Sequence, residues 1–263
     1  MSLRRNAAIS SGFKNNISLP IQRITQFIQT ELIQTISKYN QIVFFTGAGM
    51  SAESGVPTYR GAGGIWHEYK WEDYACQSAF NRDPEGVLDF HELRRKEALK
   101  CSPHEGHQII TRVQQENSNV SIVTQNIDGM HQRAGTDPVI ELHGSAWRLR
   151  CEAEGKIFVD LNRGKYQSRK CECGAWLRPD IIWFQDMLNE DTVRKATDII
   201  STCDLFISIG TSAAVWPAAG YPKLAKSAGA FCIEINPEET ELSPLYDQRI
   251  RSTASDGLTQ LFH

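Results

Sequence analysis

The sequence predicts an α/β fold, a Rossmann-like doubly wound parallel sheet with a smaller inserted domain. Three observations lead to this prediction. Short apolar runs rich in β-branched residues alternate with amphipathic helical segments, which is typical of a parallel sheet covered by helices on both faces. Glycines or polar residues follow several of these runs directly, at the strand ends where such sheets bind ligands. Two stretches of different character interrupt the alternation and indicate the inserted domain.

The first elements of the sheet are visible near the N-terminus. Residues 17–40 carry apolar side chains at i, i+3 and i+4 spacing and predict an amphipathic helix that leads into a strand at Ile42–Phe45. The further elements expected in chain order are a helix near His104–Glu116, strands at Val120–Thr124, Val139–Leu142 and Ile181–Phe184, a helix over 191–202, a strand at Leu205–Ile209, a helix over 217–228 and a strand at Phe231–Ile235.

The two interruptions define the inserted domain. The segment from Gly61 to Ser102 begins with glycines and aromatic residues and continues as a charged helical stretch, Glu85 to Lys100. The second interruption, residues 145–180, is polar and contains cysteines. We therefore expect an N-terminal extension and helix (1–40), a Rossmann-like domain (41–61, 103–144 and 181–263) and a small domain formed by two insertions (62–102, a helical module, and 145–180).

Composition limits the class of protein. Lys+Arg 28 against Asp+Glu 31 gives a net charge of −3, which argues against specific nucleic-acid binding. No apolar run approaches the roughly 18 residues of a membrane span. Seven scattered cysteines, an odd number, favour a reducing compartment, so we expect a cytoplasmic protein, and we expect a monomer. The basic residues that precede Glu31 form a short tail or a presequence, and a presequence would direct the chain to mitochondria.

The stretch from Thr46 to Arg60 follows the first strand and carries the first ligand signal. Gly47 and Gly49 allow the backbone to turn sharply and to approach a bound group closely. Ser51–Glu53 predicts the start of a helix, whose free N–H groups would face a ligand. A strand, a glycine turn and a helix N-terminus suit a pyrophosphate. Without a third glycine, a purely structural turn is an equally open reading.

Polar residues follow other strands. Gln125, Asn126 and Asp128 stand at a strand end, where Asn and Asp also mark plain turns. Asn236 follows the last strand and suits either a ribose contact or a turn. His143 follows a strand directly, and a neutral imidazole there is either a general base or a structural hydrogen-bonding group.

Together these motifs resemble a known family. GAGMSAESGVPTYR at 47–60, TQNIDGMHQRAG at 124–135, ELHGS at 141–145 and GTS at 210–212 are similar to the sirtuins, which are NAD-dependent protein-lysine deacylases, and they stand in family order. The resemblance implies NAD as cofactor and acyl-lysine proteins or peptides as substrates. It implies catalytic roles for His143, Asn126 and Asp128, and cofactor binding by Gly47, Ala48, Gly49, Ser51, Ala52, Glu53, Pro57, Tyr59, Arg60, Trp66, Gln125, Asn126, Ile127, Asp128, His143, Gly210, Thr211, Ser212, Asn236, Pro237, Glu238 and Ala254.

The implied reaction releases nicotinamide, deacylated lysine and O-acyl-ADP-ribose, with His143 as general base. Two other functions stay open on the same fold. A mono-ADP-ribosyltransferase or NAD hydrolase would pass the ribose to a side chain or to water. An NAD-binding sensor would have no chemistry, and the intact set of His143, Asn126 and Asp128 argues against it.

Acyl preference is implied by the resemblance to class III sirtuins, which remove succinyl, malonyl or glutaryl groups with a Tyr-x-x-Arg pair. Arg94 stands at the arginine position, and its planar guanidinium suits a carboxylate, whereas His91 replaces the tyrosine. Arg94 as one more charge on a basic helix, with acetyl or longer neutral groups as substrates, stays open. The acyl-lysine peptide is expected between Trp183–Phe184 and Val215, and Ala62 leaves room for a long acyl group.

The cysteines resemble the zinc site of the family, but the set of ligands is incomplete. Many sirtuins hold a structural zinc ion with two C-x-x-C pairs, but here Glu154 stands where the partner of Cys151 is expected, and Cys171 and Cys173 form a C-x-C. Three thiolates with Glu154, Asp160 or water suit tetrahedral zinc. Loss of the metal is the alternative.

Overall fold

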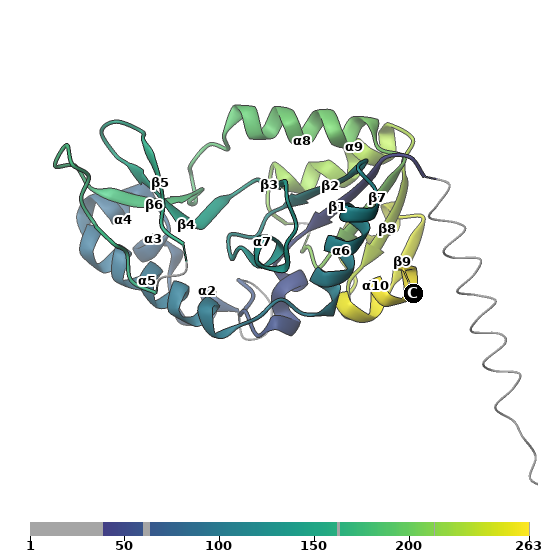
Figure 1. Cartoon of the computed structure of the whole chain (residues 1–263), viewed down its shortest axis with the longest axis horizontal. Helices are drawn as coiled ribbons and strands as arrows, with labels where there is room; N and C mark the ends of the chain where they lie inside the picture. The colour runs from purple at the N-terminus through teal and green to yellow at the C-terminus, as the bar shows by residue number, and fades with distance from the viewer. Residues whose placement is uncertain (1–38, 60–63, 162–163, 213, 263) are drawn as a thin grey trace, which may run out of the picture.

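The computed structural model describes residues 39–59, 64–161, 164–212 and 214–262. The helix expected at 17–40 lies outside the described residues, except for Tyr39 and Asn40, and so do Arg60 and Ala62. Two groups of elements are seen in Figure 1, a large group around a twisted sheet and a smaller group beside it. In the part of the chain that the structure describes, no helix has the length and hydropathy of a membrane span.

The large group is built on a six-stranded parallel sheet. Strand β1 lies near the middle, paired with β2 on one side and with β7 on the other. The strand order is β3-β2-β1-β7-β8-β9, so the chain reverses direction across the sheet at β1. The predicted doubly wound fold is therefore confirmed. The strands are β1 (Ile42–Thr46), β2 (Val120–Thr124), β3 (Val139–Glu141), β7 (Leu205–Ile209), β8 (Phe231–Ile235) and β9 (Gln248–Ile250).

Helices cover both faces of this sheet because alternate residues of each strand point to opposite sides. Ile42 and Phe44 pack toward α6 (Glu105–Glu116) and α10 (Ala254–Phe262). Val43 and Phe45 pack toward α8 (Glu190–Thr202) and α9 (Tyr221–Ser227). All five residues of β1 are buried, which explains why its sequence is a continuous apolar run.

The smaller group joins an antiparallel sheet to a cluster of helices. The sheet has the order β5-β4-β6. Its core includes Leu149 of β4, Leu88 of α5 and Trp183, so the sheet and the helices share one apolar interior. The elements are α2 (Ile65–Glu68), α3 (Trp71–Tyr74), α4 (Gln77–Arg82), α5 (Pro84–Lys100), β4 (Gly144–Cys151), β5 (Ile157–Val159) and β6 (Leu177–Ile181).

Three expectations about elements are wrong. The helix expected to start at Ser51 is a short 3-10 helix, η1 (Ala48–Ser54), which begins inside the glycine turn itself. The strand expected at Ile181–Phe184 is β6, which ends at Ile181 and belongs to the antiparallel sheet. The helix expected over 217–228 is divided into η2 (Ala218–Gly220) and α9. The elements α7 (Met130–Ala134), η3 (Ser243–Leu245), β4, β5, β9 and α10 were not anticipated from the sequence.

Candidate active site

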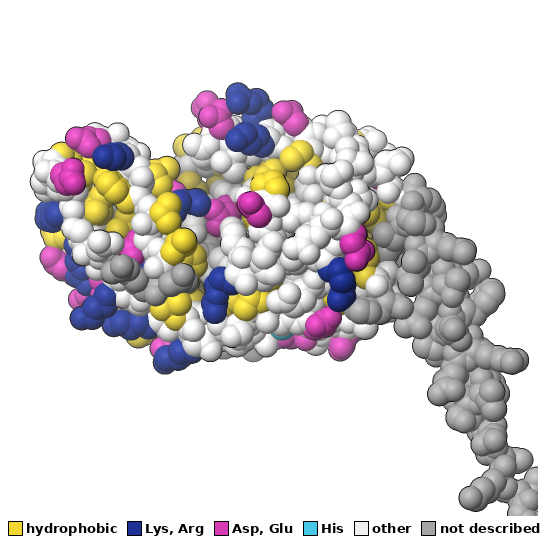
Figure 2. Space-filling view, viewed as in Figure 1, with side chains coloured by type: hydrophobic (Ala, Val, Ile, Leu, Met, Phe, Trp, Pro, Cys, Tyr) yellow, Lys and Arg dark blue, Asp and Glu magenta, His cyan; other side chains and the backbone are white. Residues whose placement is uncertain are grey.

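A cavity of about 1330 Å³ lies at the carboxyl ends of the parallel strands, against the smaller group. Turns after β1, β2, β7 and β8 form one wall, and α5 with the chain that follows β6 forms the other. Figure 2 shows the surface hollowed between the smaller group and α8, with apolar side chains on its walls. Its size suits a ligand larger than a typical drug molecule.

Three glycines make the floor of this cavity by interlocking two turns. The N–H of Gly49, after β1, donates to the carbonyl oxygen of Gly210, after β7, at 2.9 Å. A Cβ atom on Gly49 would lie 2.7 Å from Gly210 Cα, and one on Gly47 would lie 2.7 Å from Gly210 O. Only glycine fits these positions, so the two turns pack backbone against backbone at the cavity.

Asn126 joins the turn after β2 to the same floor. Its Nδ2 donates to Gly47 O at 2.9 Å, and its own N–H donates to Thr124 Oγ1 at 3.1 Å. Asp128 forms the expected Asx turn, because its Oδ1 accepts from Met130 N at 2.9 Å, and burial raises the pKa of its carboxyl. Asn126 lines the cavity, but Asp128 does not.

His143 has the geometry of a base. Its Nδ1 lies 2.8 Å from the carbonyl oxygen of Gln125, and because a carbonyl only accepts, the proton is on Nδ1. The lone pair of the neutral ring is then on Nε2. Burial lowers the pKa of His143 below its ordinary value, so the ring is neutral at neutral pH. A cavity-lining imidazole in this form can accept a proton.

His91 and Arg94 both line the cavity from α5. His91 Nε2 lies 3.1 Å from Tyr74 O and 3.2 Å from Trp183 Nε1, and burial lowers its pKa to about 4. The protonated form, which would donate more strongly to a carboxylate, is therefore absent at neutral pH. Arg94 is half-buried, and no ion pair between the described residues involves it.

The cavity gathers most of the residues predicted from the sequence, and also some that were missed. Ser51, Pro57 and Asp128 lie beside it without lining it. The predicted residues that line it are Gly47, Ala48, Gly49, Ala52, Glu53, Tyr59, Trp66, His91, Arg94, Gln125, Asn126, Ile127, His143, Trp183, Phe184, Gly210, Thr211, Ser212, Val215, Asn236, Pro237, Glu238 and Ala254. Lining residues that no sequence signal marked include Thr58, Phe90, Ile182, Gln185, Met187, Trp216 and Glu241.

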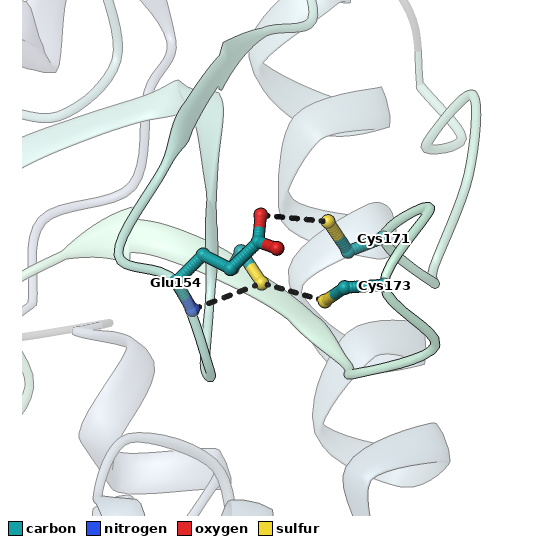
Figure 3. Close-up of side chains that lie close together, drawn as sticks. Glu154, Cys171 and Cys173 are labelled. Atoms are coloured by element: carbon teal, nitrogen blue, oxygen red, sulfur yellow. Dashed lines mark hydrogen bonds between the residues drawn. The ribbon is translucent and has the colours of Figure 1, made fainter.

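Three cysteines and one glutamate gather at the end of the smaller group (Figure 3). The ligand atoms of Cys151, Glu154, Cys171 and Cys173 all lie within 4.8 Å of one another. Cys151 Sγ is 3.5 Å from Cys173 Sγ, and Cys171 Sγ is 4.0 Å from a carboxylate oxygen of Glu154. Asp160, the other acid considered, instead accepts from Gln167 N. Three sulfur atoms and one oxygen fit a tetrahedral zinc ion.

Comparison with known proteins decides the family. A profile of the Sir2 family matches residues 47–217, from the glycine turn to the cavity-lining Pro217. The chain belongs to the Sir2 family. The family predicted from the sequence is therefore confirmed.

Curated relatives in this family carry a common name. A protein of Aquifex aeolicus named "NAD-dependent protein deacylase" is 42% identical over 230 residues, which cover 84% of this chain and 93% of that protein. A Pyrobaculum aerophilum protein named "NAD-dependent protein deacylase 2" is 42% identical, over 83% of this chain and 88% of that protein. The predicted enzyme class agrees with both names.

Solved structures of Sir2 proteins share the fold. A mutant Sir2 homologue with ADP-ribose has a TM-score of 0.84 and 37% identity, and covers 88% of this chain and 94% of its own. A Sir2 homologue with NAD has a TM-score of 0.81 and 38% identity, over 89% and 92% of the two chains.

Proposed function

We propose that this Sir2-family chain is an NAD-dependent protein-lysine deacylase in which His143 is the general base. The observation that carries the proposal is the fixed tautomer of His143, whose Nδ1–H is held by Gln125 O beside the interlocked glycine turns. The names of the relatives and the NAD and ADP-ribose complexes of similar structures support the cofactor.

The cavity suits NAD along the ends of the parallel strands. Gly47 and Gly49 donate their own N–H groups to Ile209 O and Gly210 O, and their lack of Cβ atoms lets the two turns pack closely where the pyrophosphate would lie. Thr211 and Asn236, joined by a hydrogen bond of 2.9 Å from Asn236 Nδ2 to Thr211 O, would contact the adenosine half. Asn126 and Ile127 would face the nicotinamide half.

NAD would supply an electrophilic ribose carbon at which the acyl oxygen replaces nicotinamide, and one water molecule would then release the lysine, so that the products are nicotinamide, lysine and O-acyl-ADP-ribose. His143 Nε2 would accept a proton from a ribose hydroxyl. The acyl-lysine peptide would add as a strand between Phe184 and Val215, which line the cavity from two different segments. Asn126 would hold the nicotinamide pocket in place through Gly47.

Acidic acyl groups are the substrates that Arg94 favours. The guanidinium lines the cavity and takes part in no ion pair between described residues, so a succinyl or glutaryl carboxylate would be its partner. Neutral His91 would offer at most one hydrogen bond, which distinguishes this site from the Tyr-x-x-Arg pattern of class III sirtuins.

A structural zinc ion would be held by Cys151, Cys171, Cys173 and Glu154. The four groups come from β4, the turn after it and the chain between β5 and β6. Zinc there would fix these segments to one another, at a distance from the chemistry.

The test is mass spectrometry of matched acetyl-, succinyl- and glutaryl-lysine peptides with NAD, for wild type and His143→Ala. Wild type is expected to convert acidic acyl peptides fastest. The variant is expected to lose roughly 10²- to 10⁴-fold in turnover, the usual contribution of a general base, and to bind NAD unchanged. His67→Ala, at an exposed histidine of α2, is the matched control. An active His143→Ala enzyme contradicts the assignment, and nicotinamide release without peptide consumption favours ADP-ribosyl transfer or NAD hydrolysis instead.

A further inference from the structure

Arg169 joins the chain between β5 and β6 to helix α5. Its Nη1 donates to Glu85 at 2.5 Å, its Nη2 donates to Asp89 at 2.6 Å, and its Nε donates to Glu92 at 3.2 Å. These acids are at i, i+4 and i+7 of α5, so they lie on one face of the helix. One guanidinium therefore contacts three successive turns of one helix.

The three contacts differ in strength. The side chains of Glu85 and Asp89 are 60% and 70% exposed, and ion pairs that are open to water contribute little. The side chain of Glu92 is only 6% exposed, and it also accepts from Tyr166 N at 3.2 Å. A buried carboxylate that loses its cation is strongly destabilised. The pair between Arg169 and Glu92 is thus the part of the contact that the fold depends on.

The residues at the cavity lie on the opposite side of the same helix. At about 100° per residue, Arg94 points roughly opposite to the face formed by Glu85, Asp89 and Glu92, and His91 lies about 130° from that face. Both line the cavity. Arg169 therefore contacts one face of α5, while other residues of the helix line the cavity in which the substrate would bind.

We propose that Arg169 is a positioning residue for acyl selection, which holds α5 at the depth where Arg94 reaches the acyl group. This inference rests on the proposed deacylase function. A displacement of about 1 Å of a positioning group is enough to cost a large factor in rate or affinity. Because Arg169 stands two residues before Cys171, the same contact also connects the cysteine cluster to the acyl side of the cavity.

The experiment measures kcat and KM for acetyl- and succinyl-lysine peptides of one sequence, with wild type, Arg169→Gln, Arg169→Lys and the double variant Arg169→Gln/Glu92→Gln. We expect Arg169→Gln to raise the KM for the preferred peptide about tenfold, through displacement of α5, and to leave the KM for NAD unchanged. Lysine restores one charge and is expected to recover part of the effect. The double variant removes the uncompensated carboxylate and is expected to recover more.

Arg82→Gln is the matched control, because Arg82 makes an exposed ion pair with Asp73 at 3.2 Å and neither residue lines the cavity. Hydrogen exchange of residues 85–97 is expected to rise in Arg169→Gln and not in Arg82→Gln. A lower melting temperature with an unchanged ratio of the two peptide KM values would show a merely structural role and overturn the inference. A wild-type enzyme that consumes neither peptide would contradict the deacylase function itself.

Discussion

The two walls of the cavity are held in different ways. On the parallel-sheet side the turns are fixed by backbone hydrogen bonds and by glycines that admit no Cβ atom, as at Gly49 and Gly210. On the smaller side, buried arginines fix the elements. Arg95 donates to Asp160 O at 2.6 Å, and Arg178 lies 3.6 Å above the ring of Trp183 and pairs with Asp186 at 2.7 Å.

This difference shows which wall is open to variation. The cavity floor on the parallel-sheet side is made of closely packed backbone, whose shape is fixed. Such a floor suits a cofactor that is the same in every turnover. A wall held by charged side chains can be altered by single substitutions that each displace one element, such as α5. We therefore expect cofactor binding to be lost all at once, and acyl selection to be adjustable in steps.

Acid is expected to lower the stability of both the large and the smaller group, and this is the largest of the effects that we expect. Burial lowers the pKa of His107 to about 2 and that of His131 to about 4 in the large group, and that of His91 to about 4 in the smaller group. The unfolded chain binds these protons near pH 6.5 and the folded chain does not, so the free energy of unfolding falls as the pH falls from about 6.5 to about 4. The slope approaches about 1.4 kcal/mol per pH unit for each histidine.

Urea unfolding at a series of pH values measures this slope. Replacement of His131 or His91 by Asn is expected to lower the slope by one proton each. A free energy of unfolding that does not change between pH 6.5 and pH 5 would contradict the neutral burial of these rings.

Gly210→Ala is the next largest expected effect and tests the parallel-sheet wall. Gly210 has a φ of 59°, and a Cβ atom there would lie 2.4 Å from Met50 N. The strain and the clash are expected to cost about 2–5 kcal/mol of stability and to abolish NAD binding. Gly155→Ala is the control, because Gly155 has a φ of 66° but no atom within 4 Å, and about 1 kcal/mol is expected there. Equal losses of stability in Gly210→Ala and Gly155→Ala would show that the close contact between the two turns adds no cost beyond the backbone strain of a positive φ.

A change in zinc affinity on substitution of Glu154 is the smallest expected effect, and it tests the wall formed by the smaller group. Glu154→Ala is expected to weaken zinc binding by at least about tenfold, the loss that even an outer partner of a ligand can cause. Glu154→Cys is expected to strengthen it, because zinc binds thiolates well. Release of zinc to a coloured chelator measures both, and the affinity for NAD should stay constant. A change in NAD affinity would mean that the two walls are not independent.

The sequence predicted the buried parallel strands well, because β1, β7 and β8 are short, mostly apolar runs with at most one polar residue each, and nearly all of their residues are buried. It failed for β6, whose Leu-Arg-Pro-Asp-Ile sequence is typical of a turn. Arg178 is buried in this strand only because Asp186 and Gln77, from other elements, supply its partners. Long-range partners of this kind have no local signal.

The site shows the same limit. Gly47, Asn126 and His143, which the motifs at strand ends singled out, line one cavity, since parallel strands end at one edge. The fourth group of the cysteine cluster was left open between Glu154, Asp160 and water, and the fold places Glu154 there, whereas the Asp160 carboxylate accepts from Gln167 N and pairs with Arg95. Which acid is free depends on contacts that sequence spacing does not show.

The central position of β1 has a consequence for the newly made chain. Ile42 pairs with Val120 on one side and with Leu205 on the other, so the apolar strand β1 leaves the ribosome long before its second neighbour exists. Until then its Val-Phe-Phe edge has unpaired backbone groups, a state in which apolar strands associate with other chains. The strand order that brings the two turns together thus also requires that β1 be kept from associating with other chains during synthesis.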